Sequence, residues 1–267
     1  MNGIERRFKE LKSRGEVAFI PYITAGDPTL KMTGDLVMAL EEAGADIVEF
    51  GVPFSDPVAD GVVNQEAAQR ALKNNTSLRD IIGLVKDLRQ KTEIPIVLFT
   101  YYNPVLAYGV PEFAADAAEA GVDGVLCVDL PPEEAGEYKH YLDERGLSTI
   151  FLAAPTSTEQ RIALIAGAAT GFVYYVSRTG VTGERDRIET SVPMMVARIK
   201  EHTEAPVAVG FGISTPEQAA EVAGYADGVI VGSAIVRMVG ALGDAPDTAA
   251  RVGSFVKSLV DAAKRRA

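Results

Sequence analysis

The stretch DIVEFGVPFSDPVADG, residues 46–61, puts a carboxylate where the wall of a parallel barrel should be apolar, and a second carboxylate on the loop that follows. Side chains alternate between the two faces of a strand, so Glu49 lies on the face opposite to the apolar Val48 and Phe50. In a barrel covered by helices the apolar face packs outward, which turns Glu49 into the lumen near the C-terminal end of its strand. Barrel enzymes place their chemistry at that end.

Seven further apolar runs alternate with longer segments of helical period. This alternation is typical of parallel βαβ units, and eight units in about 250 residues match a TIM (β/α)8 barrel. We therefore expect that fold, and the alternative with the same local pattern is an open doubly wound sheet. The predicted strands are residues 17–23, 46–52, 95–101, 123–129, 148–154, 171–177, 206–211 and 227–232.

An extra helix is expected before the first strand. Residues 3–14 carry Ile4, Phe8 and Leu11 at helical spacing, and the face that they form would close the bottom of the barrel. Apolar stripes of the same period predict the helices that cover the outside, for example over residues 78–88.

Weak internal similarity supports a repeated unit. The segments AGADIVEF, AGVDGVLCVD and YADGVIVG each place an aspartate between a helix end and a strand, at Asp46, Asp123 and Asp227. No linker, charge block or low-complexity tract divides the chain. We expect a single barrel domain over residues 1–267.

The bulk composition is that of a soluble globular protein, with 47% hydrophobic and 24% charged residues. A formal charge of −11 argues against broad contact with nucleic acid or anionic membrane. The single cysteine, Cys127, excludes an internal disulfide framework. The charged N-terminal segment lacks the apolar core of a signal peptide, and no run approaches about 18 apolar residues, so we expect a cytoplasmic protein.

The sequence lacks the residues that several kinds of catalysis require. The only histidines, His140 and His202, fall in predicted outer helices, so we expect no metal site and no Ser-His-Asp relay. No lysine ends a predicted strand, which argues against a Schiff base, and the first strand has no Rossmann glycine fingerprint after it. Acid and base catalysis by carboxylates, without a cofactor, remains.

Glycines at two late strand ends predict a phosphate site. GFGIS at 210–214 and VGSAI at 231–235 follow the seventh and eighth strands, where TIM barrels often bind phosphate. Glycine lets the backbone approach a ligand closely, and a helix N-terminus favours an anion. Gly183, after the sixth strand, would add a third backbone contact. The alternative is that these glycines only form tight turns.

The polar candidates have structural alternatives as well. Glu49 serves either the chemistry or a buried ion pair with an arginine. Asp60 either reaches the site or caps the following helix, while Asp56 and Asn64 are ordinary capping or turn candidates. Asp129, at the end of the fourth strand, either faces the mouth or forms a turn.

Two further questions stay open at the sixth strand. Tyr174 and Tyr175 are neighbours, so one faces the lumen and the other faces the helices, but alternation alone does not choose between them. The following loop SRTGVTGERD, residues 177–186, is either a lid over the mouth or an ordinary exposed loop.

Several long motifs identify a family. Through PYITAGDP at 21–28, EFGVPFSDPVADG at 49–61, YYVSRTGVTG at 174–183 and the two glycine motifs, the chain resembles tryptophan synthase alpha subunits over essentially its full length. The resemblance implies a lyase of tryptophan biosynthesis that cleaves indole-3-glycerol phosphate to indole and glyceraldehyde 3-phosphate, a retro-aldol reaction. It also implies an alpha2-beta2 complex, in which a beta subunit that carries pyridoxal phosphate receives the indole.

The resemblance implies roles for individual residues. Glu49 would be the acid/base, Asp60 would hold the indole N–H, and the motif selects Tyr174 over Tyr175 as the third catalytic residue. This division agrees with the chemistry, since carbon 3 of indole gains a proton, a glyceryl hydroxyl loses one, and positive charge builds on the ring nitrogen. The phosphate contacts would be Gly183, Gly212, Gly232 and Ser233, and the indole pocket or lid contacts would be Tyr22, Phe99, Tyr101 and Asp129.

The chain departs from the family pattern just after Asp60. Val62 and Asn64 stand where a proline and an isoleucine are usual, in a loop expected to face the partner. Three other functions remain for comparison: a stand-alone indole-producing lyase, a non-catalytic activator that binds the same ligand, and an isomerase or synthase acting on a related phosphorylated substrate.

Overall fold

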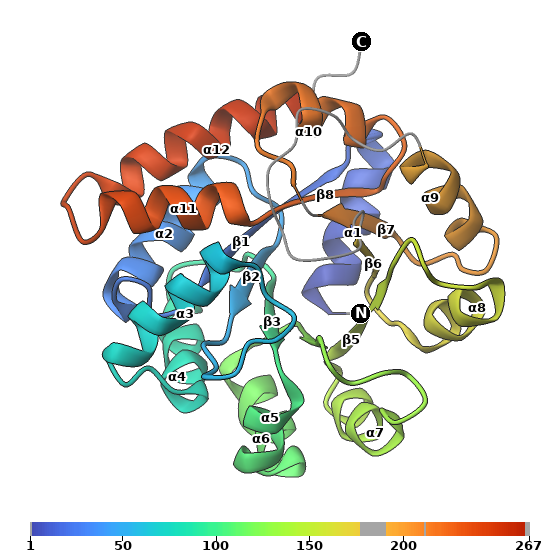
Figure 1. Ribbon diagram of the computed structural model, residues 1–267, viewed down its shortest axis with the longest axis horizontal. Coiled ribbons are helices and arrows are strands. Elements are labelled where there is room, and N and C mark those ends of the chain that lie inside the picture. Colours follow the sequence, from blue (N-terminus) through green and yellow to red (C-terminus); the bar gives the residue numbers. More distant parts are fainter. Residues whose placement is uncertain (1, 177–190, 211, 265–267) are drawn as a thin grey trace.

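The computed structural model describes residues 2–176, 191–210 and 212–264 of the 267-residue chain. Eight parallel strands form a closed barrel in chain order, inside a ring of helices (Figure 1). The last strand pairs with the first, in a register that runs from Ala18 opposite Gly228 to Pro21 opposite Val231. The predicted TIM barrel is therefore confirmed, and the open doubly wound sheet is wrong because the eighth strand closes the sheet.

Each strand falls on its predicted segment, within two residues at the ends. The strands are β1 (Ala18–Thr24), β2 (Val48–Gly51), β3 (Ile96–Thr100), β4 (Gly124–Cys127), β5 (Ser148–Ala153), β6 (Val173–Val176), β7 (Val207–Gly210) and β8 (Gly228–Val231).

The described helices include the predicted N-terminal one. They are α1 (Gly3–Arg14), α2 (Leu30–Glu42), α3 (Val62–Lys73), α4 (Leu78–Leu88), α5 (Tyr102–Tyr108), α6 (Val110–Ala120), α7 (Gly136–Glu144), α8 (Glu159–Ala168), α9 (Val192–Lys200), α10 (Pro216–Ala223), α11 (Ser233–Leu242) and α12 (Thr248–Lys264). Within the described ranges, no helix is both long and apolar enough to cross a membrane.

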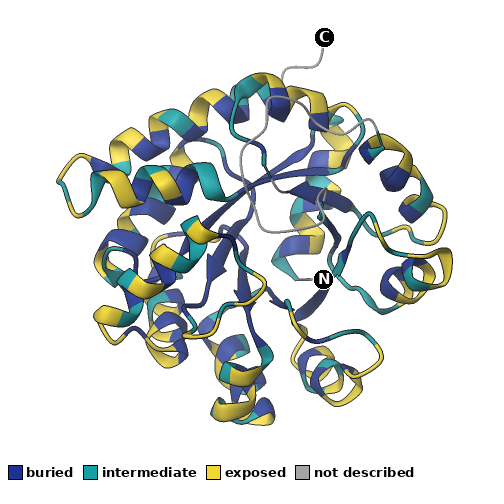
Figure 2. Ribbon diagram, in the orientation of Figure 1, coloured by how far each residue is buried: buried dark blue, intermediate teal, exposed yellow. Residues whose placement is uncertain are grey.

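Alternate strand residues divide the core into two layers. One layer packs between the strands and the inner faces of the helices, whose outer faces are exposed (Figure 2). The other layer fills the lumen, and its members include Ile20, Ile47, Val97, Leu126, Ile150, Ala208 and Ile230.

Helix α1 closes the bottom of the lumen, as its apolar face predicted. Ile4, Phe8 and Leu11 belong to the same cluster as the lumen residues, and the rings of Phe8 and Phe172 lie 5.8 Å apart. The lumen is thus a packed core at its N-terminal end, which leaves the C-terminal end of the strands for a ligand.

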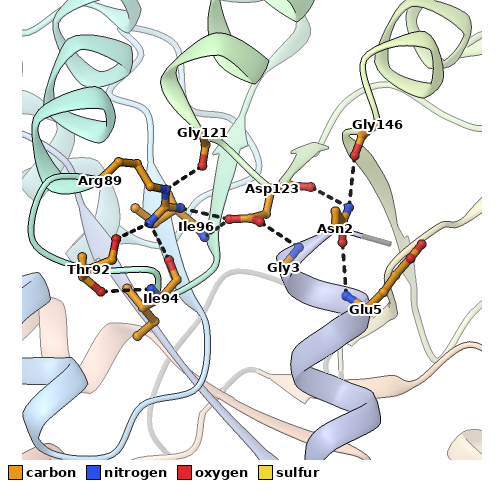
Figure 3. Close-up of polar contacts among 10 residues, drawn as sticks. All are labelled: Asn2, Gly3, Glu5, Arg89, Thr92, Ile94, Ile96, Gly121, Asp123 and Gly146. Carbon is orange, nitrogen blue, oxygen red and sulfur yellow. Dashed lines mark hydrogen bonds and ion pairs between the residues drawn. The ribbon is translucent and has the colours of Figure 1, made fainter.

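Asp123 fixes α1 to the barrel (Figure 3). One carboxylate oxygen accepts the backbone N–H of Gly3 at 3.0 Å, and the other accepts the N–H of Ile96 at 2.9 Å and Nη2 of Arg89 at 3.0 Å. The side chain of Asn2 donates to the Asp123 carbonyl oxygen at 3.1 Å. One carboxylate therefore joins the first helix, the third strand and the end of α4.

The three repeated aspartates share one structural role. Each stands just before a strand and accepts a hydrogen bond from a backbone N–H at the start of the preceding strand. The pairs are Asp46 with Phe19 at 2.8 Å, Asp123 with Ile96 at 2.9 Å and Asp227 with Val207 at 2.9 Å. Each carboxylate also pairs with a cation, from Arg7 and Lys264, from Arg89, and from Lys200 respectively. The repeat thus secures the N-terminal end of the barrel, opposite the mouth.

Candidate active site

A cavity opens at the C-terminal ends of the strands and gathers most of the predicted site residues. It draws on β1, β3, β5 and β6 and on the segments that follow β2, β4, β7 and β8, so residues from distant parts of the sequence meet there. The lining consists of Tyr22, Ala59, Asp60, Gly61, Asn64, Phe99, Val128, Leu152, Tyr174, Gly212, Gly232 and Ser233.

Glu49 lies in the wall of the lumen, next to this cavity. Its strand neighbours in register are Tyr22 on β1 and Val97 on β3, and its side chain is fully buried. Among the described residues, neither carboxyl oxygen has a hydrogen-bond partner. The alternative of a buried ion pair is therefore wrong for the described part of the chain.

Burial without a partner changes the protonation state of Glu49. Desolvation disfavours the charged form and raises the pKa of this carboxyl from 4.5 to about 8. Glu49 therefore holds a proton at neutral pH and can act as a general acid. A strongly shifted carboxyl at the mouth of a barrel is typical of a catalytic group.

Two phenols cover the region around Glu49. Gly51 is the next inward-facing residue of β2, and the Tyr22 hydroxyl fills the space that a Cβ on Gly51 would need. In the same way the Tyr174 hydroxyl fills the space at Gly210 on β7. Burial is the main cause of the raised pKa of both phenols, and ionised Glu49 raises it further, next after burial at Tyr174 and behind Asp60 at Tyr22. Both rings therefore lie close to the Glu49 carboxyl.

Tyr174 is the tyrosine that faces the lumen. It lies in register with Leu152 on β5 and Ala208 on β7, within the lumen cluster. Tyr175 packs in the outer layer under the helices. The rings of Tyr22 and Phe99 meet edge-on at 5.3 Å, and the ring of Phe99 lies 6.5 Å from that of Tyr174. These three rings, inclined to one another by 82° and 59°, give the cavity an apolar aromatic wall that suits an aromatic ligand.

Asp60 reaches the cavity from the loop after β2. The Tyr101 hydroxyl donates to Oδ2 of Asp60 at 2.9 Å and accepts the backbone N–H of Ala59 at 3.0 Å. Helix α3 begins after Gly61 without a side-chain cap, so the alternative that Asp60 caps this helix is wrong. Burial raises the pKa of Asp60, and hydrogen bonds from Tyr101 and Asn64 oppose that rise.

The two glycine motifs differ at their helices. After β7, Thr215 and Gln218 form a capping box, in which the Gln218 side chain accepts the N–H groups of Ser214 and Thr215. The N-terminal amides of α10 are thus largely satisfied by the chain itself. Gly212, at a φ of +82°, lines the cavity as part of the turn before this helix.

The N-terminus of α11 is open toward the cavity. Its N-cap is Gly232, which provides no side-chain hydrogen bond, and the N–H groups of Ile235 and Val236 both bond to the Gly232 carbonyl. This leaves the N–H groups of Ser233 and Ala234 directed out of the helix end. Within the described ranges these two amides have no hydrogen-bond partner, and the positive end of a ten-residue helix favours an anion.

Some predicted residues lie elsewhere. Asp129 lies in the turn after β4, is exposed and is absent from the cavity lining, and its Oδ1 accepts the N–H of Tyr102, the first residue of α5, at 2.7 Å. Tyr101 supports Asp60 without lining the cavity. Gly183 and the loop 177–186 lie outside the described residues, so neither the third phosphate contact nor the lid is tested. Within the described ranges, no group of three or more His, Cys, Asp or Glu side chains has the arrangement of a metal site.

Sequence reasoning missed part of the lining. Leu152 shares the face of Ile150 on its strand, so alternation along residues 148–154 could have placed it in the lumen. Val128 follows the end of β4 in the same way. Asn64 was interpreted as a capping or turn residue, and the signal for another role was its place one helical turn after Asp60.

A larger hollow lies at the other end of the barrel. It is lined by charges of both signs, including Lys9, Lys12 and Lys200, and Lys200 is paired there with Asp227 at 2.9 Å. None of the predicted site residues lies in it. The chemistry-bearing groups therefore point to the cavity at the mouth.

Comparison with known proteins agrees with this geometry. A family model described as tryptophan synthase alpha chain matches residues 8–264. The chain belongs to the tryptophan synthase alpha chain family. A tryptophan synthase alpha chain from Geobacter sulfurreducens is 54% identical over 262 residues, which cover 98% of this chain and 97% of that protein.

Solved structures of tryptophan synthases share the fold. A structure of the Mycobacterium tuberculosis enzyme superimposes with a TM-score of 0.91 at 37% identity and covers 99% of both chains. A structure of the tryptophan synthase α2β2 complex of Pyrococcus furiosus superimposes with a TM-score of 0.86 at 42% identity, covering 91% of this chain and 98% of that one. Within this tryptophan synthase alpha barrel, the motifs at 21–28 and 49–61 and the VGSAI segment all meet at the mouth cavity.

Proposed function

We propose that this chain cleaves indole-3-glycerol phosphate to indole and glyceraldehyde 3-phosphate. The observation that carries the proposal is a pair of carboxyl groups with different surroundings beside one cavity. Glu49 is buried and has no hydrogen-bond partner in the described part of the chain, whereas Asp60 accepts a hydrogen bond that favours its charged form. Such a pair supplies an acid and an anion at the same pH. Family membership supports the same reaction.

Each residue has a step in this proposal. Protonated Glu49 gives its proton to carbon 3 of the indole ring, and Asp60 holds the ring N–H while positive charge builds on the nitrogen. The Glu49 carboxylate then takes the proton of the adjacent glyceryl hydroxyl, and the carbon–carbon bond breaks as its electron pair returns to the ring. Indole and the aldehyde leave, and Glu49, protonated by the hydroxyl group, is ready for the next turnover. The N-terminus of α11, at Ser233, would hold the phosphate, and Tyr174 would stack beside the ring.

The direct test is to incubate the purified chain with indole-3-glycerol phosphate and to follow indole. We expect release by the chain alone and faster release with a beta chain present. Binding of the substrate without indole in either condition would favour the non-catalytic activator. Conversion to a different product would favour the isomerase or synthase.

The pH dependence follows from the Glu49 carboxyl. Because the reaction starts from protonated Glu49 and its pKa is raised to about 8, kcat/KM should fall on the alkaline side with a midpoint near that value. The acid limb should report Asp60, which must be ionised. Initial rates of indole release between about pH 5 and pH 10 give the profile. A rate that keeps rising through pH 9 would argue against a protonated starting state.

Ser233→Asp tests the phosphate end. A carboxylate at the first residue of α11 would repel the phosphate dianion, so KM should rise about 10- to 100-fold while kcat falls much less. Ser233→Ala keeps both free amides of the helix end and is the matched control, with KM expected within about threefold of the wild type. Steady-state kinetics of indole release measure both. An unchanged KM in Ser233→Asp would place the phosphate elsewhere.

We also propose that a beta chain receives the indole, and that this partner, not the alpha chain, carries pyridoxal phosphate. The P. furiosus relative is an α2β2 complex. Val58, Val62 and Leu106, which follow the C-terminal ends of β2 and β3, are exposed by 85%, 61% and 57%, and apolar side chains at the mouth suit a protein partner. Sedimentation with a beta chain should show a complex, and Val58→Asp should weaken it.

We place this enzyme in the cytoplasm, which agrees with its single, buried and unpaired Cys127.

A further inference from the structure

Asn64 occupies an unusual place beside the reacting groups. It is the third residue of α3, its backbone N–H bonds to the Gly61 carbonyl at 3.0 Å, and its side chain lines the same cavity as Asp60 and Tyr174. The family pattern usually has an apolar isoleucine there. An amide in this position adds one donor and one acceptor to the wall of the cavity.

The two ends of the Asn64 amide have different surroundings. The Asn64 amide interacts with the Asp60 carboxyl and favours its charged form, which lowers the pKa of Asp60, and the NH2 group is the end that can donate to it. This orientation is the one that the chemistry requires, because an ionised carboxylate only accepts. The Oδ1 atom, by contrast, is buried and has no hydrogen-bond partner among the described residues.

A buried acceptor without a donor is unfavourable and rare in folded proteins. At the wall of a ligand cavity, the missing donor is supplied by the ligand. Indole-3-glycerol phosphate has three donors for this purpose: the ring N–H and its two glyceryl hydroxyl groups. Asp60 takes the ring N–H in the proposed function, so a hydroxyl group remains for Oδ1 of Asn64.

We propose that Asn64 positions Asp60 through its NH2 group and binds a glyceryl hydroxyl of the substrate through Oδ1. This inference rests on the proposed function and adds a specificity residue to it. Asp60 is then held from two sides, by the Tyr101 hydroxyl and by the amide of Asn64. The substrate is selected both for its ring and for its hydroxylated chain.

Asn64→Leu removes both ends of the amide at nearly the same volume. We expect kcat/KM for indole release to fall about 10-fold or more, because hydrogen bonds to a charged group and to the substrate are lost. The acid limb of the pH profile should move to higher pH, since the lost hydrogen bond favours ionised Asp60. Asn64→Asp, which is isosteric, should move it further because of like-charge repulsion.

Gln69→Leu is the matched control. Gln69 is an exposed amide on the same helix, so its replacement changes the helix composition in a similar way without touching the cavity. We expect wild-type kinetics and a wild-type acid limb. If Asn64 had only a structural role, its replacement would lower activity, but the midpoint pH of the acid limb would not rise in the order wild type, Asn64→Leu, Asn64→Asp.

A substrate analogue isolates the Oδ1 contact. In 3-(indol-3-yl)propyl phosphate the ring and the phosphate ester are kept and the hydroxyl groups are absent. Asn64→Leu should lower kcat/KM for the substrate more than it weakens calorimetric binding of this analogue. If Asn64→Leu lowers kcat/KM for the substrate and the binding of the analogue by the same factor, Oδ1 of Asn64 does not bind a hydroxyl group.

The outcomes separate the two proposals. If the wild-type chain releases no indole with a beta chain present, the proposed function fails and this inference fails with it. If the wild type is active and Asn64→Leu matches Gln69→Leu in kcat/KM and in the acid limb, only the inference is overturned. If Asn64→Leu does not fold, the acid limb of Asn64→Asp decides.

Discussion

Glu49→Gln should reduce indole release by about 10³- to 10⁴-fold while the chain stays folded. Glutamine keeps the shape of the side chain but cannot deliver a proton to carbon 3 or accept one from the hydroxyl. Because the phosphate end and the aromatic wall are untouched, binding of 3-(indol-3-yl)propyl phosphate should persist. Rates of indole release with a beta chain present measure the loss. Retained turnover in Glu49→Gln would assign the proton transfer to another group.

The same substitution should stabilise the fold at alkaline pH. The folded pKa of Glu49 is raised from 4.5 to about 8, so the folded state holds a proton that the unfolded state loses. The wild type therefore loses stability as the pH rises from the unfolded pKa to the folded one, by an amount on the order of 5 kcal/mol once the pH exceeds both. Glutamine does not titrate and escapes this loss.

Urea unfolding at about pH 5 and at about pH 9 tests the direction of this pH dependence of stability. The stability of Glu49→Gln relative to the wild type should increase between the two pH values. Glu66→Gln makes the same chemical change at an exposed position of α3 and should show no such trend. A difference that does not depend on pH would mean that Glu49 is already ionised in the folded chain.

Asp46→Ala should destabilise the chain by about 3–5 kcal/mol, which is the usual result of breaking a buried ion pair. The Asp46 carboxylate accepts Nη2 of Arg7 at 2.6 Å, Nζ of Lys264 at 2.9 Å and the backbone N–H of Phe19 at 2.8 Å, and its side chain is 0% exposed. Its loss frees α1, the end of α12 and the start of β1 together.

Urea unfolding at neutral pH measures this effect, with Asp87→Ala as the control. Asp87 is an exposed aspartate on α4, and its replacement should change the free energy of unfolding by less than about 0.5 kcal/mol. Indole release by Asp46→Ala at low temperature should stay near that of the wild type, because Asp46 lies at the end of the barrel away from the mouth. A loss below about 1 kcal/mol would show that the repeated aspartates are not structural anchors.

The fold was predictable because its signals are local. Each strand is a short apolar run, each helix has its own stripe, and alternation alone placed Glu49 in the lumen. The repeated aspartates were visible in the sequence, but their role was not. The contact of Asp46 with Phe19 crosses 27 residues, and a local pattern carries no information on such a pair.

The site was predictable in its residue types and only partly in its arrangement. Asp60 and Tyr101 are 41 residues apart, so their hydrogen bond could not be inferred from spacing. The choice between Tyr174 and Tyr175 needed the register with the neighbouring strands. The difference between the two glycine motifs was readable, since Thr215 and Gln218 have the spacing of a capping box and α11 has no equivalent.

The central claim is that Glu49, a buried carboxyl with no partner among the described residues, holds its proton at neutral pH. Infrared difference spectra between the wild type and Glu49→Gln, recorded across a pH titration, report this carboxyl directly. The structure predicts a protonated carboxyl band at about pH 6 that disappears with a midpoint of about 8. A carboxylate band already complete at about pH 6 would contradict the account.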